Sequence, residues 1–193
     1  MQPRDMVLLT LREWNGRIGG KTKLQKIVYF TALLSGQEDG LGYDAHYYGP
    51  YSPVVEEALY ELTAIGLVDV RTLRTGQVDG LGFEKVRYDY SLTEGGLQVA
   101  ESRSVRLGAD GKRVIRAARK VRKQGEQHYM RLAAAAKLLH LVRRSGRPVT
   151  QVELQEMAPH LGWHLSDEEA DRAVEYLAAL GLVKVSAAPT GRA

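Results

Sequence analysis

The sequence predicts a mostly α-helical chain with small β wings, an α+β fold in which a basic helix joins two winged helix-turn-helix-like units. The composition is that of a globular protein with a core, because 44% of the 193 residues are hydrophobic and 26% are charged. The first half is expected to run helix, helix, helix, hairpin, which is the order of a winged helix-turn-helix unit. The second half repeats this order, since residues 177–185 are closely similar to residues 62–70.

The expected organisation has four parts. A chain of this length accommodates one large domain or two domains of roughly 100 residues. We expect an N-terminal winged-helix-like domain at 1–102, a basic connecting helix at 103–129, a C-terminal winged-helix-like domain at 130–185 and a flexible tail at 186–193.

The first two helices are indicated by apolar spacing. Residues 5–14 carry leucines and a methionine at near-helical intervals, and three glycines end this segment. Residues 21–34 repeat apolar side chains near a 3.6-residue period, which leaves Lys23 and Lys26 outside the apolar stripe. A glycine-rich loop then leads to an extended aromatic stretch at 43–48 and a turn at Gly49-Pro50.

The third helix has clear start and stop signals. The Ser52 hydroxyl can accept from an early backbone N–H, and a proline after it loses no hydrogen bond at the first helical position. Glu56 and Glu57 complement the positive end of the helix dipole, and Gly66 supplies a left-handed stop after residue 65.

The remaining elements follow from the same rules. Two β-rich segments around a glycine loop predict a hairpin, and a short helix is expected to start at Thr93-Glu94. The hairpin strands are expected at 67–71 and 86–91, the later helices at 130–144, 149–161 and 167–180, and a last strand at 182–185.

The charge is unevenly distributed. The net charge is +4, yet residues 1–100 hold 10 Lys and Arg against 13 Asp and Glu, a net of −3. The other residues are therefore strongly basic, and residues 103–131 alone hold ten basic residues and two acids. Such a block is typical of a solvated helix face or of a surface that binds an anionic partner.

Residues 112–123 are the best nucleic-acid candidate, because they form an amphipathic helix on a helical wheel. One side is apolar, and the basic side chains share the other: Lys112, Arg113, Arg116, Arg119, Lys120 and Lys123. We interpret this face as a phosphate-binding surface, with DNA favoured over RNA. An acidic protein surface, such as the acidic helices of a second copy, and a merely solvated connecting helix are the alternatives.

The third helix of each unit is acidic and therefore unsuited to the major groove. Residues 52–65 contain three glutamates and no Lys or Arg, and residues 167–180 contain five acids and one arginine. Sequence choice is expected to come from the wing instead. The residues proposed there are Arg71, Arg74, Lys85 and Arg87, and Lys21, Lys23 and Lys26 are expected to extend the basic surface.

A second hypothesis rests on tyrosines and acids. Six of the ten tyrosines fall between residues 29 and 60, where amphipathic rings can anchor an interface or pack in turns. In this interpretation the chain is a protein-interaction module, an antitoxin or an adaptor. Its partner-binding residues are Tyr43, Tyr47, Tyr48, Tyr51, Glu56 and Glu57.

Four motifs in the first half resemble, in order, those of the YwgA-like family of bacterial and archaeal proteins. They are Lys23-Leu-Gln-Lys-Ile-Val-Tyr29, His46-Tyr-Tyr-Gly-Pro-Tyr-Ser-Pro53, Glu61-Leu-Thr-Ala-Ile-Gly-Leu67 and Tyr90-Ser-Leu-Thr-Glu-Gly-Gly96. More distantly, the Leu-Gln-Lys helix and the Tyr-Gly-Pro turn are similar to the Panacea domain of phage-associated antitoxins. The Tyr-Ser-Leu-Thr-Glu ending is similar to the wing exit of winged-helix regulators. Neither family resemblance implies a catalytic residue.

Several function classes find no support in the sequence. The chain has no cysteine, which excludes disulfides, thiolate catalysis and Cys-based metal sites. His160 and His164 have a metal-pair spacing without a third ligand, and no nucleophile or phosphate-loop motif is present. We therefore expect a cytoplasmic, non-enzymatic protein without cofactor, metal or membrane segment. By analogy with helix-turn-helix regulators, it is expected to form a homodimer.

Overall fold

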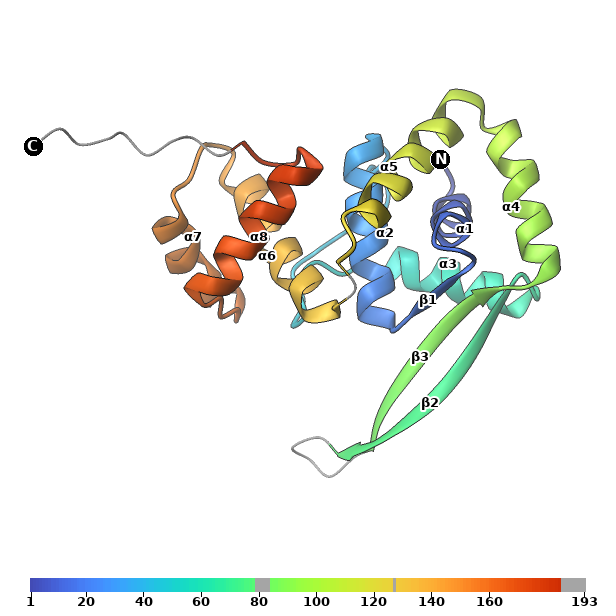
Figure 1. Cartoon of the computed structure of the whole chain (residues 1–193), viewed down its shortest axis with the longest axis horizontal. Coiled ribbons are helices and arrows are strands. Elements are labelled where there is room, and N and C mark those ends of the chain that lie inside the picture. Colours follow the sequence, from blue (N-terminus) through green and yellow to red (C-terminus); the bar gives the residue numbers. More distant parts are fainter. Residues whose placement is uncertain (79–83, 127, 185–193) are drawn as a thin grey trace, which may run out of the picture.

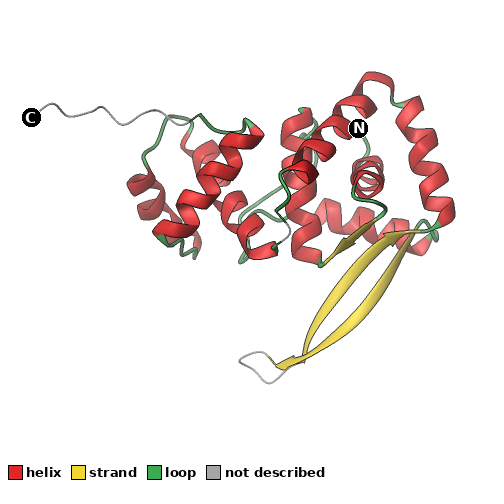
Figure 2. Ribbon diagram, viewed as in Figure 1, coloured by secondary structure: helices red, strands yellow, loops and turns green. Residues whose placement is uncertain are grey.

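The computed structural model describes residues 1–78, 84–126 and 128–184, and it has an α+β fold as expected. Helices dominate and one small sheet accompanies them (Figure 2). In order, the elements are α1 (Pro3–Glu13), β1 (Arg17–Gly19), α2 (Lys21–Ser35), α3 (Pro53–Ala64), β2 (Val68–Val78), β3 (Glu84–Leu92), α4 (Glu94–Arg106), α5 (Gly108–Lys123), α6 (Tyr129–Ser145), α7 (Gln151–Met157), the 3-10 helix η1 (Ala158–Leu161) and α8 (Asp167–Leu180).

Helix α1 is the centre of the N-terminal half. It packs against α2, α3, α4 and α5, which surround it in Figure 1. This position explains its sequence, because a helix with neighbours on most sides is buried around nearly its whole circumference. Every residue from Asp5 to Leu11 is buried, including the polar Thr10.

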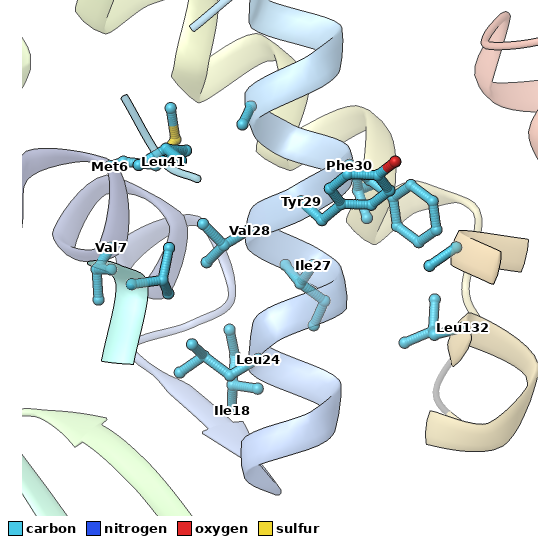
Figure 3. Packing of buried hydrophobic residues seen from close by; sticks show 14 of the residues in the cluster. Met6, Val7, Ile18, Leu24, Ile27, Val28, Tyr29, Phe30, Leu41 and Leu132 are labelled. Carbon is cyan, nitrogen blue, oxygen red and sulfur yellow. The ribbon is translucent and has the colours of Figure 1, made fainter. Parts of the chain in front are cut away.

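Helix α2 lies between the two halves of the chain. It contacts α1 and α5 on one side and α6 on the other. Figure 3 shows Val28 directed towards α1, and Phe30 directed towards Leu132 of α6. Buried apolar residues from both halves belong to one cluster, so the chain has a continuous core.

Lys26 lies on α2 within this buried region, and the expectation that it is a surface cation is wrong. Its side chain is only 2% exposed. The apolar stripe of α2 is wider than the periodicity indicated, because α5, α6 and the aromatic loop at 43–52 all cover the helix.

The sheet is antiparallel with strand order β1-β3-β2. Ile18 lies opposite Tyr90 on one side and Val70 lies opposite Tyr90 on the other, so the three side chains share one face of the sheet, on which Ile18 and Tyr90 are buried and Val70 is exposed. The hairpin of β2 and β3 was expected, but its strands are longer and the three-residue β1 was not predicted. The hairpin projects well beyond the helices (Figure 1).

Helix α5 is part of the N-terminal core as well as a link. Its apolar side, with Val114, Ala118 and Val121, is buried against α1 and α2. The expected boundary at residue 102 falls inside α4, which turns directly into α5 at Gly108. The stretch at 103–129 is therefore the end of α4, all of α5 and a short connection, instead of one connecting helix.

The C-terminal half contains α6, α7, η1 and α8. Capping boxes begin α7 at Thr150 and α8 at Ser166. In each box the hydroxyl accepts a hydrogen bond from the backbone N–H of a glutamate three residues later, and the carboxylate of that glutamate accepts one from the backbone N–H of the capping residue. The strand expected at 182–185 is absent over Leu182–Lys184, so that prediction is wrong for the described part. Val185 and the expected tail at 186–193 lie outside the described residues.

Candidate nucleic-acid interface

The basic face of α5 is exposed, as the helical wheel predicted. All six side chains from Lys112 to Lys123 that form it are in contact with solvent. Three of them also have partners within the chain. Arg113 pairs with Asp110 at 2.5 Å, Arg119 pairs with Glu13 at 2.6 Å, and the Lys120 Nζ donates to the Leu180 carbonyl at 2.6 Å. Within the described chain, Lys112, Arg116 and Lys123 have no such partner.

Glu13 at the end of α1 holds two arginines. Its carboxylate is buried, with Arg12 Nη1 2.9 Å from Oε1 and Arg119 Nε 2.6 Å from Oε2. Two cations on one anion leave a net charge of +1. Because the Arg119 side chain is 54% exposed, its guanidinium is held in a fixed place while its outer edge faces solvent.

Asp89 on β3 repeats this arrangement. It is 3% exposed, and it lies 2.7 Å from Arg87 Nε and 3.1 Å from Arg17 Nη2, both on half-exposed side chains. Burial alone would raise the pKa of Asp89, but hydrogen bonds from Arg87 and Arg17 outweigh it and lower the pKa. The carboxylate therefore stays ionised, and the group again has a net charge of +1.

Gly19 of β1 makes room for this second group. A Cβ at Gly19 would lie 2.2 Å from Arg87 Nη2 and 2.9 Å from Asp89 Oδ1. The position of the Arg87 guanidinium beside Asp89 thus depends on the missing side chain, which explains a glycine in this strand.

The two groups are neighbours because only a short turn separates Glu13 from Arg17. In this turn, Asn15 Oδ1 accepts a hydrogen bond from Arg122 of α5 at 2.7 Å. Lys23 lies with its Nζ 5.4 Å from the centre of the Trp14 ring, and burial followed by the charge of Arg87 lowers its pKa. We call the resulting surface the basic strip: Arg12, Arg17, Lys23, Arg71, Arg87, Arg119 and Arg122.

The expected wing residues divide between the two faces of the hairpin. Arg71 lies directly across from Asp89 and Arg87 lies beside it, so both belong to the basic strip. Arg74 is opposite Val86 on the other face. The side chain of Lys85 lies outside the described residues. In Figure 1 the strands β2 and β3 extend away from α5, and the hairpin packs against α1, α2, α3 and α4.

Sequence reasoning missed Arg12, Arg17 and Arg122. The local sequence does not distinguish Arg17 and Arg122, because Arg17 is held by Asp89, 72 positions later, and Arg122 is held by Asn15, 107 positions earlier. Arg12 is held by the adjacent Glu13. A weak signal was available in the apolar surroundings of Glu13 and Asp89, since acids buried in an otherwise apolar element require cationic partners.

The acidic helices face solvent and are partly neutralised. On α3, Glu56 pairs with Lys21 and Glu61 lies 3.3 Å from Arg4, while Glu57 is exposed. On α8, Glu168 pairs with Arg172 at 2.5 Å.

The tyrosines proposed for partner binding do not act as one set. Tyr43 packs against Tyr29 with ring centres 4.8 Å apart, and burial raises its pKa strongly. Tyr51 is half-buried beside His46. Tyr47 and Tyr48 are exposed and form an edge-to-face contact with each other, and Tyr48 forms another with Tyr129 of α6.

The described residues contain no group of three or more His, Asp or Glu side chains arranged to hold a metal. Over the same residues, no helix is both long and apolar enough to cross a bilayer. Among known proteins, no family model matches this chain and no curated protein matches it.

Proposed function

We propose that this chain is a non-enzymatic regulatory protein that binds nucleic acid, DNA in preference to RNA, through the basic strip and the adjoining face of α5. The arginine pairs on Glu13 and Asp89 carry this proposal. A buried carboxylate that orients two partly exposed guanidiniums supplies fixed donors for phosphate oxygens and keeps a positive net charge.

The binding mode follows from the position of the strip. The root of the hairpin and the C-terminal end of α5 would contact the phosphate backbone together, while the acidic α3 stays away from the major groove. In this proposal the N-terminal half acts as a winged-helix-like unit whose wing root, and not its third helix, meets the nucleic acid. A homodimer would place two strips on one duplex.

The test measures fluorescence anisotropy of a labelled random duplex over a salt series. In an Arg17→Ala, Arg119→Ala variant, each buried carboxylate keeps one arginine, so the fold is retained while two exposed charges are lost. We expect weaker binding and a log–log salt slope that is smaller by about two, since each phosphate contact contributes about 0.9.

The matched control is Arg143→Ala, Arg172→Ala. These arginines are similarly exposed and each pairs with one acid, but they lie in the C-terminal half and their acids are not buried. The control variant should keep the wild-type slope. Equal losses in both variants, or no binding by the wild type at low salt, would contradict the proposal.

We also infer that the N-terminal half is related to the YwgA-like proteins. The four motifs pair in space, which supports a shared framework. Gln25 of the first motif exchanges hydrogen bonds with the backbone of Ser52 in the second. Thr93 in the fourth donates through Oγ1 to the Gly66 carbonyl in the third at 2.9 Å.

A second candidate function is a protein-interaction module, such as an antitoxin or an adaptor. It is favoured by the exposed cluster of Tyr47, Tyr48 and Tyr129, because Tyr47 is 72% exposed and such rings commonly anchor interfaces. A partner that co-purifies with the wild type should be lost from Tyr47→Ala, Tyr129→Ala. It should be retained by Tyr60→Ala, which removes an equally exposed ring from α3.

A further inference from the structure

A pocket of about 280 Å³ opens between the start of α2 and the aromatic loop. Lys21, Thr22 and Lys26 line it from the helix, and His46, Tyr48 and Tyr51 line it from the loop. The volume is just below the range of roughly 300–1,000 Å³ that drug-sized ligands occupy, so a compact ligand fits best.

Among the described residues, two lysines and no carboxylate line the pocket, and Lys21 is paired with Glu56, which lies outside the lining, so Lys26 is the lysine without an acidic partner. Lys26 is almost completely buried, and its Nζ donates to the carbonyls of Pro50 at 2.6 Å and Gly49 at 3.3 Å. An ammonium group has three N–H donors, so one remains after these two bonds. Within the described chain, no acid is paired with Lys26.

A second lysine increases the local positive potential. Lys137 of α6 lies against Gly49. Burial, and to a lesser extent the charge of Lys137, lowers the pKa of Lys26 to about 7. At neutral pH a fraction of Lys26 is charged without a counter-ion, which is unfavourable in a buried position. An anion in the pocket would remove this penalty.

The start of α2 faces the same space. Its N-cap is Gly20, which offers no side-chain acceptor, so the first-turn amides of Lys21 and Thr22 have no partner within the described chain. Free amides at the positive end of a 15-residue helix dipole favour an anion. The Thr22 hydroxyl adds a neutral donor at this end of the pocket.

Aromatic groups form the opposite wall. The ring of His46 lies with its centre 5.1 Å from that of Tyr51, and Lys21 lies over the Tyr51 ring at 5.7 Å. Tyr48 completes this wall, so the pocket has a cationic end and an aromatic side. A ligand that matches both has an anionic group attached to a flat organic part.

We propose that this pocket binds a small phosphomonoester, with its phosphate at the start of α2 between Lys21 and Lys26 and its organic part against Tyr48 and Tyr51. The terminal oxygens of a phosphate can accept from the free amides of Lys21 and Thr22, from the Thr22 hydroxyl and from the remaining N–H of Lys26. A nucleoside monophosphate has the required combination of phosphate and ring. The site is independent of the basic strip and of the function proposed for it.

The experiment is isothermal titration calorimetry of the full chain with three probes. AMP carries the phosphate and the ring, inorganic phosphate carries only the anion, and adenosine carries only the ring. We expect AMP to bind at least tenfold more tightly than adenosine, and inorganic phosphate to compete with AMP. Equal affinities for AMP and adenosine, or no binding of AMP, would overturn the proposal.

Variants locate the binding in the pocket. Lys26→Met keeps the length of the buried side chain and removes the ammonium group, so it should weaken the binding of AMP at least tenfold. Thr22→Val is a second pocket variant for which folding is not at risk, and a weakening of several-fold is expected. The strip variant Arg17→Ala, Arg119→Ala should bind AMP like the wild type. Thermal melting followed by circular dichroism confirms that each variant is folded.

The outcomes separate the two proposals. Loss of duplex binding in the strip variant with unchanged AMP affinity supports a pocket independent of the strip. AMP affinity that falls in the strip variant and not in Lys26→Met or Thr22→Val would place the phosphate on the strip and overturn the pocket.

Discussion

The ammonium nitrogen of Lys26 lies 2.6 Å from the carbonyl oxygen of Pro50, in a position that solvent barely reaches. This contact fixes the turn at Gly49-Pro50 to the middle of α2. Together with the exchange between Gln25 and Ser52, it makes the aromatic loop a rigid wall.

Lys26 makes stability depend on pH. Its pKa is lowered to about 7 in the folded chain from 10.5, so between these values the unfolded chain binds more protons. Stability should therefore rise as the pH increases above 7, by an amount on the order of a few kcal/mol before tyrosines ionise. Urea unfolding from pH 6 to pH 9 measures this, and Lys26→Met should flatten the rise. A wild-type profile that falls over this range would refute it.

Two adjacent glycines of α4 should respond in opposite ways to the same change. A Cβ at Gly96 would lie 1.9 Å from the backbone oxygen of Leu67, which cannot move without displacing the start of β2. Gly96→Ala should cost about 3 kcal/mol or more. A Cβ at Gly95 would meet only side-chain atoms, at 3.8 and 3.9 Å. Gly95→Ala should therefore leave the free energy of unfolding unchanged or raise it by up to about 1 kcal/mol. Urea midpoints of the two variants give the comparison.

Gly19 links stability to the proposed binding surface. In Gly19→Ala, the guanidinium of Arg87 must leave Asp89, which keeps its contact with Arg17. The stability loss should be modest, about 1 kcal/mol, because the displaced group is the end of a half-exposed side chain. Duplex affinity should nevertheless fall, since the fixed donor is lost. Full affinity at low salt would show that the orientation of Arg87 is irrelevant.

Trp163 joins the C-terminal half to the aromatic loop. It is fully buried, and its Nε1 donates to the His46 carbonyl at 2.7 Å. Trp163→Phe keeps most of the ring but leaves this carbonyl unpaired, so we expect a loss of about 1–3 kcal/mol. Denaturant unfolding measures the loss. Val152→Ala, on an exposed site of α7, is the matched control and should cost less than about 0.5 kcal/mol.

Elements specified by local signals could be predicted from the sequence. The start of α3 was predicted correctly because it depends on a contact within one turn, in which the Ser52 hydroxyl accepts a hydrogen bond from the Val55 amide at 2.9 Å. The exposed face of α5 is correct because its amphipathicity is set by neighbours three and four residues apart.

Features that depend on distant partners could not be predicted. β1 has three residues and exists because it pairs with β3, about 70 positions later. The strip residue Arg17 is positioned by Asp89, and Lys26 is buried by a loop whose path no local pattern reveals. The resemblance between residues 62–70 and 177–185 predicted a second strand, yet β2 has β3 as a partner and Leu182–Lys184 has none among the described strands.

The placement of α2 between α1 and α6 determines how far this molecule can be divided. A cut near Gly125 would leave each fragment with an uncovered apolar face, because Phe30 and Leu132 belong to the same cluster. The two halves are therefore not interchangeable modules. A chain that carries only one of them would be expected to aggregate.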